Sequence, residues 1–141
     1  MKKYLIICII IFTFHGMSSQ SLKEFQWENR VILVLTDSLN SQAFEKQLNL
    51  LESDLHALKD RKLILIHAVP QKRRILFSES SEWQDSEIYK QYKSNGNHFE
   101  VILIGLDGRI KLRQKEILET AKLYDLIDSM PLRQAEKGSN N

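Results

Sequence analysis

The fold is decided by residues 31–69, which read VILVLTDSLNSQAFEKQLNLLESDLHALKDRKLILIHAV. The first five residues, 31–35, are all apolar, as in a strand that is buried on both faces. Residues 62–69 contain a second such run. Between the two runs, apolar residues at spacings of four, three, four and three predict one amphipathic helix of about four turns. These residues are Phe44, Leu48, Leu51, Leu55 and Leu58. Two strands joined by a helical crossover pair in parallel, so this stretch predicts a βαβ unit.

The second half of the chain predicts a ββα unit. Residues 99–104 form a third apolar strand, and Asp107-Gly108 is typical of a tight turn before an alternating strand over 110–113. A last helix is expected over 114–129, ending before Pro131. The whole pattern predicts an α/β protein, a thioredoxin-like three-layer sandwich with a central mixed sheet (βαβ then ββα) and flanking helices. Another small α/β sandwich with a different strand order is the alternative.

The remaining segments have weaker patterns. Residues 22–29 alternate as an edge strand or a docking arm would, and residues 85–93 have the spacing of a short helix. Residues 71–84 form a polar excursion that contains Lys72-Arg73-Arg74. Such a run is usually a solvated loop, although it could receive an anionic ligand or an acidic partner.

The N-terminus has the three regions of a secretory signal peptide. Lys2 and Lys3 precede an uncharged, mostly apolar run over residues 4–14, and small residues around Ser18 and Ser19 suit cleavage. The run is shorter than the roughly 18 to 20 apolar residues of a membrane span. We therefore expect a signal peptide over 1–19, one domain over 20–136 and a disordered tail over 137–141. The protein would be secreted or periplasmic, with no stable membrane anchor after cleavage.

Composition narrows the function classes. The chain has 20 Lys and Arg and 18 Asp and Glu, and two of the basic residues lie in the expected signal, so the rest carries equal numbers of each sign. A nucleic-acid-binding domain would be expected to be basic, so nucleic acid is not an expected partner. The single cysteine, Cys8, lies in the expected signal. The domain therefore has neither a disulfide nor a thiol for catalysis.

Three stretches resemble one known family. They are FQWENRV at residues 25–31, VILIGLDGRIKL at 101–112 and IDSMPLRQAE at 127–136. Over roughly residues 22–136 the chain is similar to the domain of unknown function 4174 family. That family is a thioredoxin-like group distantly similar to peroxiredoxins, found in exported bacterial proteins and in some vertebrate extracellular-matrix proteins. The resemblance implies the fold and an exported location, and it implies no activity.

The candidate chemistry is sparse. In thioredoxin-like enzymes the attacking cysteine follows the first buried strand, at the start of the next helix. Here that position reads Ser38-Leu39-Asn40-Ser41, and Ser38 and Ser41 are interpreted first as helix caps and second as ligand contacts. The histidines His56, His67 and His98 lack metal-ligand spacing. We expect no catalytic residue, no metal and no cofactor.

Partner contacts are the remaining candidates. Asp128, Arg133 and Gln134 flank a helix end, where Arg133 is expected to pair with a carboxylate or helix carbonyls and pin the tail. Trp27 and Trp83 could anchor a partner or pack their segments onto the domain. The sequence thus favours a non-catalytic binding or structural module for an envelope or extracellular protein. The alternative is an enzyme, oxidoreductase-related or other, with a ligand pocket at residues 36–41.

Overall fold

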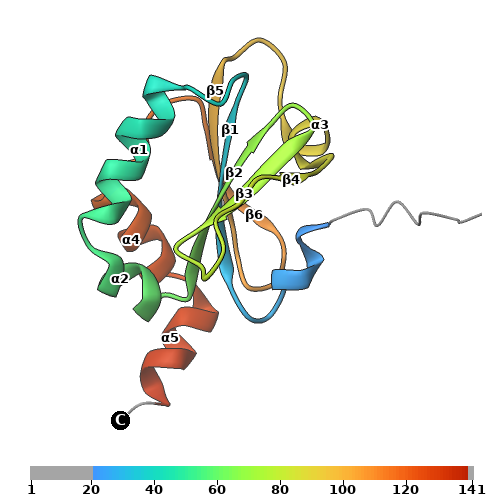
Figure 1. The fold of residues 1–141 in the computed structure, drawn as a ribbon. Helices are drawn as coiled ribbons and strands as arrows, with labels where there is room; N and C mark the ends of the chain where they lie inside the picture. Colours follow the sequence, from blue (N-terminus) through green and yellow to red (C-terminus); the bar gives the residue numbers. More distant parts are fainter. Residues whose placement is uncertain (1–20, 140–141) are drawn as a thin grey trace, which may run out of the picture.

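A computed structural model describes residues 21–139, so the expected signal peptide lies outside the described residues. The strands are β1 (Arg30–Thr36), β2 (Leu63–Val69), β3 (Lys72–Leu76), β4 (Gln84–Asp85), β5 (Phe99–Ile104) and β6 (Ile110–Gln114). The helices are η1 (Leu22–Phe25, a 3-10 turn), α1 (Gln42–Glu52), α2 (Leu55–Asp60), α3 (Ile88–Tyr92), α4 (Thr120–Asp128) and α5 (Pro131–Gly138). The strands form one sheet in the order β4-β3-β2-β1-β5-β6 (Figure 1).

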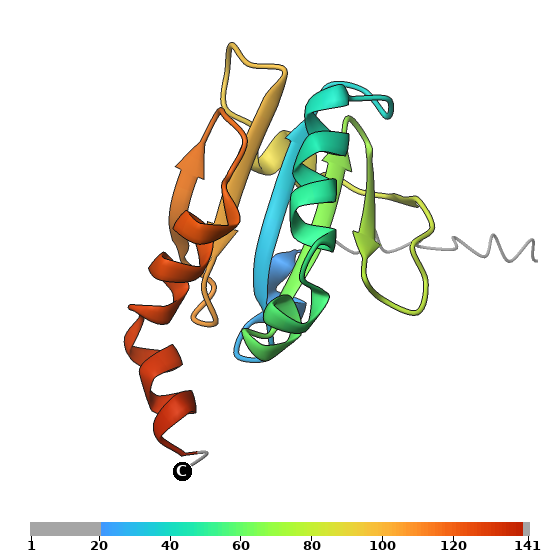
Figure 2. The ribbon, with the colours of Figure 1, turned by 90° about the vertical axis from the view of Figure 1, so that its left-hand side faces the viewer.

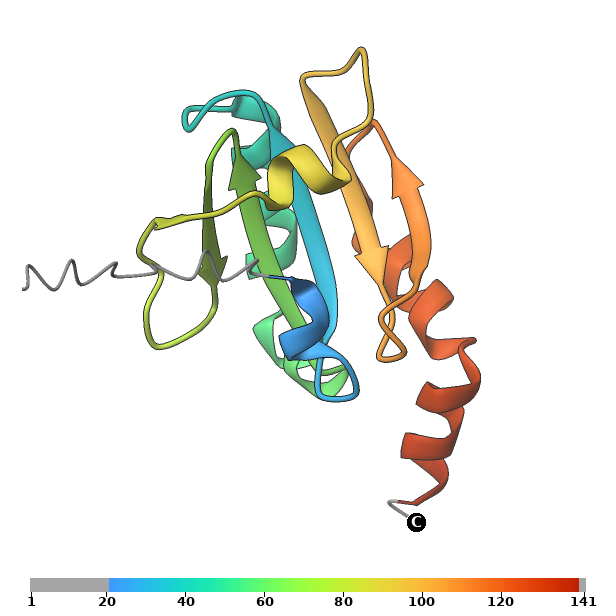
Figure 3. The same ribbon diagram turned by 90° about the vertical axis from the view of Figure 1, so that its right-hand side faces the viewer.

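The sheet is the middle layer of three. Helices α1, α2 and α4 cover one face (Figure 2), and η1 and α3 cover the other (Figure 3). Because β1 alternates between the two faces, Ile32 and Val34 enter the core under α1 and α4, whereas Val31, Leu33 and Leu35 enter the core under η1 and α3. All seven residues of β1 are buried. The predicted α/β sandwich is confirmed.

The predicted βαβ unit is confirmed with one correction. Strands β1 and β2 are parallel, with Val31 opposite Ile64, and the antiparallel hairpin of β5 and β6 is also present. The single helix expected between β1 and β2 is two helices. Asp54 breaks it, because its carboxylate accepts the N–H of Ala57 at 2.9 Å and caps a new helix. Leu55 is consequently 50% exposed rather than buried.

The prediction of a solvated loop around Lys72-Arg73-Arg74 is wrong. These residues begin β3, which pairs antiparallel with β2. Strand alternation sends Arg73 and Arg74 to opposite faces. Arg73 is 3% exposed and pairs with Glu24 of η1 at 2.8 Å. Its aliphatic stem is buried while its charge is compensated.

Both ends of the domain also differ from the sequence-based expectation. Residues 22–25 form a 3-10 turn instead of an edge strand. The last helix begins at Thr120 instead of residue 114, because the Gln47 amide hydrogen-bonds both backbone groups of Leu118 at 2.7 and 3.0 Å. Pro131 occupies the first turn of α5, where its missing N–H costs nothing, and the helix continues to Gly138, past the expected domain end at residue 136.

The two ends of the parallel strands provide the frame for the site. We call the end where β1 and β2 finish, with the loop 37–41, the carboxyl pole; it is at the top of Figure 1. The end where β1 and β2 begin, with α2 and α5 beside it, is the amino pole. Within residues 21–139, no helix is both long and apolar enough to cross a membrane.

Candidate functional site

The loop at the carboxyl pole is closed by its own hydrogen bonds. The Ser41 hydroxyl accepts the N–H of Phe44 at 3.2 Å and caps α1, as predicted. The Thr36 hydroxyl donates to the carbonyl of Ser38 at 2.9 Å. The side chain of Ser38 is exposed and hydrogen-bonds to no described residue. Neither serine contacts a side chain that could serve as its base.

A buried histidine fills the space behind this loop. His67 on β2 is fully buried and stacks on Phe44, with ring centroids 3.6 Å apart. Its Nε2 lies 2.7 Å from the Thr36 hydroxyl. Since that hydroxyl gives its one hydrogen to Ser38, Nε2 carries the ring proton and donates it to Thr36. Burial, with the positive charge of Arg74 as a smaller cause, lowers the pKa of His67 to about 3.

Arg74 and Trp83 cover this stack. The Arg74 guanidinium carbon lies 4.8 Å from the Trp83 ring centroid and 5.3 Å from that of Phe44. Trp83 also meets His67 with centroids 5.2 Å apart, so it packs its segment onto the domain. Trp27, by contrast, remains 63% exposed. Packed rings thus lie behind the loop 38–41, which corresponds to the position of the thioredoxin-like nucleophile.

Sequence reasoning missed a polar network beside the same loop. Asp37 accepts from the hydroxyl of Tyr89 at 2.5 Å and contacts the imidazole of His98. The hydrogen bonds from Tyr89 and then His98 lower the pKa of Asp37. Burial, together with the nearby Asp37 carboxylate, raises the pKa of Tyr89 to about 12. In the sequence, Asp37 belongs to the loop 36–41 and Tyr89 to the short helix expected over 85–93. The fold brings these two side chains together.

The three histidines lie on different elements of the fold. His56 lies on α2, His67 in β2 and His98 just before β5. Among residues 21–139, His, Cys, Asp and Glu side chains nowhere gather in threes that could hold a metal ion.

At the amino pole, the C-terminal residues singled out in the sequence form a pin. Arg133 is 5% exposed, donates to the Asp60 carbonyl at 2.8 Å and to Asp128 at 3.2 Å, and contacts the Asp60 carboxylate. Gln134 contacts the Asp128 carbonyl. Although burial opposes it, hydrogen bonds from Arg61 and Arg133 hold the pKa of Asp128 below its usual value. The expected pairing of Arg133 with carboxylate and carbonyl groups is confirmed.

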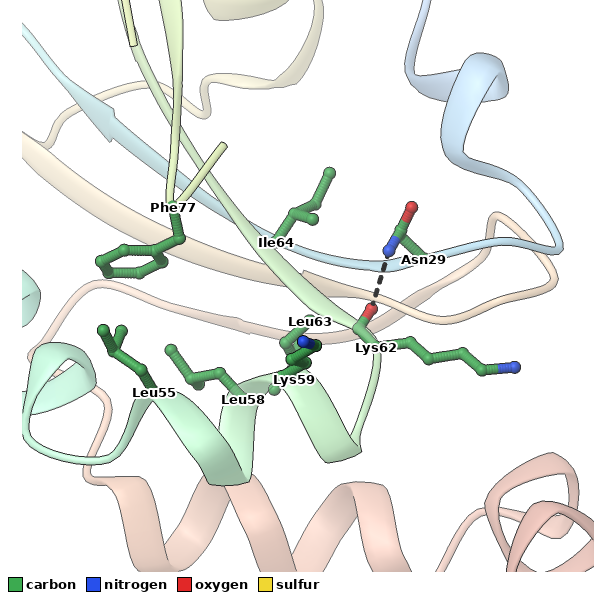
Figure 4. A pocket seen from close by; sticks show the side chains of 8 residues that line it. All are labelled: Asn29, Leu55, Leu58, Lys59, Lys62, Leu63, Ile64 and Phe77. Carbon is green, nitrogen blue, oxygen red and sulfur yellow. Dashed lines mark hydrogen bonds between the residues drawn. The ribbon is translucent and has the colours of Figure 1, made fainter. Parts of the chain in front are cut away.

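An open groove lies beside this pin. It has a volume of about 510 Å³ and runs between α2, the start of β2 and the end of β3. Its lining residues are Asn29, Leu55, Leu58, Lys59, Lys62, Leu63, Ile64 and Phe77. Figure 4 shows Leu55 and Leu58 rising from α2 toward Phe77 and Ile64 on the opposite wall. Five of the eight lining residues are apolar, two are lysines and none is acidic.

The groove keeps large apolar side chains in water. Leu55 is 50% exposed and Phe77 is 40% exposed. Phe77 also has a φ of +62°, a left-handed conformation that is unusual for an aromatic residue. In the sequence, Phe77 lies within the polar excursion over residues 71–84, and Leu55 is part of the apolar stripe of the expected helix. The exposed apolar wall was missed because it depends on the break at Asp54.

Comparisons with known proteins agree with this fold. Residues 21–136 match the family model "Domain of unknown function (DUF4174)". The structure resembles a reduced 2-Cys peroxiredoxin of Plasmodium vivax, with a TM-score of 0.54, 14% identity, and 82% of this chain and 72% of that chain covered. It also resembles thioredoxin peroxidase I of Plasmodium yoelii, with a TM-score of 0.55, 16% identity, and 82% and 79% covered. No curated protein matches the chain. At these identities the likeness shows a thioredoxin-like fold alone.

Proposed function

Because the chain belongs to the DUF4174 family, whose name assigns no activity, we propose its function from the geometry: an exported, non-catalytic module that binds a partner protein at its amino pole. The partner presents an extended segment in which apolar side chains alternate with Asp or Glu. Leu55 and Phe77 would contact the apolar side chains, and Lys59 the carboxylates, whereas Lys62 already contacts Glu136 at 3.3 Å.

The groove carries this proposal. Its volume of about 510 Å³ lies within the range of roughly 300–1,000 Å³ that is usual for ligand-binding clefts. Covering half-exposed Leu and Phe side chains removes apolar surface from water at about 25 cal/mol per Å². Two lysines and no carboxylate line the walls, so the groove complements a segment that is both apolar and acidic.

The carboxyl pole supports the non-catalytic part. Residues 21–139 include no cysteine, and the loop where a thioredoxin-like enzyme has its thiol is capped by Ser41 and backed by the Phe44–His67 stack. The alternative, an enzyme with a pocket at residues 36–41, needs converging polar groups in an open site, and the Asp37, Tyr89 and His98 network is the part of this pole that could supply them. A fully buried His67 with a pKa of about 3 is neutral and unavailable as a base for an external substrate.

Export is proposed from the N-terminal pattern. Lys2, Lys3 and the uncharged run over residues 4–14 are typical of a signal peptide. The intact mass of protein recovered outside the cytoplasm tests this. Cleavage after Ser18 or Ser19 supports export, whereas an uncleaved chain would retain Cys8 and contradict it.

Peptide binding tests the groove. Synthetic peptides that alternate Leu or Phe with Asp and Glu would be titrated against the protein, with Lys-substituted versions of the same peptides as charge controls. We expect the acidic peptides to bind and to perturb the amide signals of residues 55–64 and 77. Leu55→Asp should weaken binding about tenfold, since it removes an apolar contact and adds a charge of the peptide's own sign.

The matched control is Leu39→Asp. Leu39 is 47% exposed and lies in the loop at the other pole, so this variant makes the same change away from the groove. It should bind like the wild type. Lys59→Glu should shift the preference toward the Lys-substituted peptides. Equal binding of both peptide sets, or equal losses for Leu55→Asp and Leu39→Asp, would contradict the proposal.

A further inference from the structure

A second pocket at the amino pole is separate from the groove. It has a volume of about 180 Å³ and lies between the β5–β6 turn and the junction of α4 with α5. Leu106, Met130, Pro131 and Leu132 supply apolar walls, and Arg30 lines it from the first position of β1. A pocket of this size holds a small molecule or one terminal side chain. It is too small for a drug-sized ligand.

Arg30 is a buried cation whose hydrogen-bonding capacity is only partly used. Its exposed fraction is 0%. Nη1 donates to the Arg61 carbonyl at 2.9 Å and to the Glu136 carboxylate at 3.2 Å. Nε and Nη2 are buried and have no hydrogen-bond partner among the described residues. Each unpaired buried donor costs free energy, which an oxygen acceptor in the pocket would recover.

The charge of Arg30 is also only partly compensated. Glu136, its one carboxylate partner within residues 21–139, additionally contacts Lys62 at 3.3 Å and Arg133 at 3.6 Å. On the opposite wall, Lys111 is already paired with Asp107 at 2.7 Å. The pocket therefore has a net positive wall.

The first turn of α5 adds to this preference. Pro131 and Leu132 begin the helix and line the pocket, and no side chain caps this end. Uncapped amides at a helix N-terminus favour a negative charge. Arg30 supplies a buried donor that is independent of the helix. The helix end and Arg30 together make this pocket specific for an oxyanion.

We propose that this pocket binds a carboxylate that carries a short apolar chain. Arg30 lines the pocket, and its unpartnered Nε and Nη2 are two donors of the kind that bind two carboxylate oxygens. The apolar chain would lie against Leu106, Met130 and Leu132. Two sources offer this chemistry: a small free carboxylic acid, and the C-terminal residue of a peptide that ends in an apolar side chain.

Titration of the purified protein with defined probes, followed by amide chemical shifts, tests the site. The probes are 3-methylbutanoate, its neutral amide, inorganic phosphate, and a short peptide ending in Leu with either a free or an amidated C-terminus. We expect a carboxylate probe to shift residues 105–107 and 130–132, and its neutral counterpart to bind at least about tenfold more weakly. Binding of the free acid points to the first source, and binding of the free-ended peptide alone points to the second.

Two variants keep the test independent of folding. Arg30→Met removes the two guanidinium donors, but it also leaves Glu136 with fewer partners. Leu132→Trp fills the mouth of the pocket from a residue that is 43% exposed and leaves Arg30 intact. Its matched control, Leu39→Trp, makes the same change at the other pole.

Leu132→Trp should weaken carboxylate binding about tenfold or more, and Leu39→Trp should leave it unchanged. Three results would overturn the proposal: no carboxylate probe binds, acid and amide bind equally, or phosphate binds as well as 3-methylbutanoate. The last result would mean that charge alone is recognised. None of these results bears on the groove, because the groove and this pocket share no lining residue.

Discussion

The two poles of the sheet differ in how closely their aromatic and apolar side chains are packed. At the carboxyl pole, Phe44 and His67 are fully buried and stacked, and the His67 Nε2 proton has an acceptor in Thr36. At the amino pole, Phe77 is 40% exposed at a φ of +62°, and Arg30 is buried with two unpaired nitrogens. A thioredoxin-like enzyme places its reactive group at the first of these poles. In this chain that pole contains a buried ring stack, although His67 Nδ1 and Arg74 Nε have no partner among the described residues. The two pockets for which we propose binding lie at the other pole.

This difference indicates which residues serve stability and which serve binding. Close packing stabilises a folded core, whereas exposed apolar surface and strained backbone mark candidate functional sites. The comparison therefore predicts large stability effects at the carboxyl pole and small ones for equivalent changes in the groove.

The largest effect is expected from a pair of phenylalanine truncations. Phe44→Ala removes a ring that is 0% exposed and stacked on His67, and should cost about 3–5 kcal/mol of the free energy of unfolding. Phe77→Ala removes a ring that is 40% exposed and should cost less than about 1 kcal/mol. Urea denaturation of both variants measures the difference. Similar losses would mean that the groove is part of the core, and the comparison would fail.

The sequence predicted the buried elements better than the surface between them. The unbroken apolar runs within residues 31–35 and 62–69 specify central strands. Both strands and their parallel pairing were predicted correctly. Leu55 was misplaced because its spacing fits a continuous helix, whereas the Asp54 carboxylate favours a new cap. Local hydrogen bonding decided between two structures that share one apolar pattern.

The candidate sites depended on contacts that are remote in sequence. The pin made by Arg133 was expected, but its partner Asp60 lies 73 residues away. Arg30 showed no signal at all, since a single basic residue before an apolar strand usually faces solvent. Its importance follows from burial under α5, which only the folded chain reveals.

A smaller effect is expected from pH. Burial lowers the pKa of His67 to about 3, whereas an unfolded histidine has a pKa near 6.5. The unfolded chain therefore binds more protons between these values, and the stability that His67 contributes is complete above pH 6.5 and is lost as the pH falls toward 3. From pH 6.5 to 4.5 the free energy of unfolding that His67 contributes should fall by about 2–3 kcal/mol.

Denaturation at several pH values, compared between the wild type and His67→Gln, measures this dependence. The variant lacks the titrating group, so its free energy of unfolding should change much less over the same two pH units. A wild-type protein whose stability is flat from pH 6.5 to 4.5 would indicate that His67 is hydrated and accessible. The carboxyl pole would then be open, as the enzyme alternative requires.

The smallest predicted effect tests whether the loop 37–41 has a structural role or binds a ligand. Thr36→Val keeps the side-chain shape but removes the hydroxyl that accepts from His67 and donates to the Ser38 carbonyl, so a buried ring N–H loses its partner. We expect a loss of about 1–2 kcal/mol in the free energy of unfolding. Ser38→Ala, two residues away, removes an exposed hydroxyl without a described partner and should change stability by less than about 0.5 kcal/mol. If Thr36→Val were neutral, the Thr36 hydroxyl would contribute nothing to folding. The case that this loop is held closed for structural reasons, with binding left to the amino pole, would lose its main support.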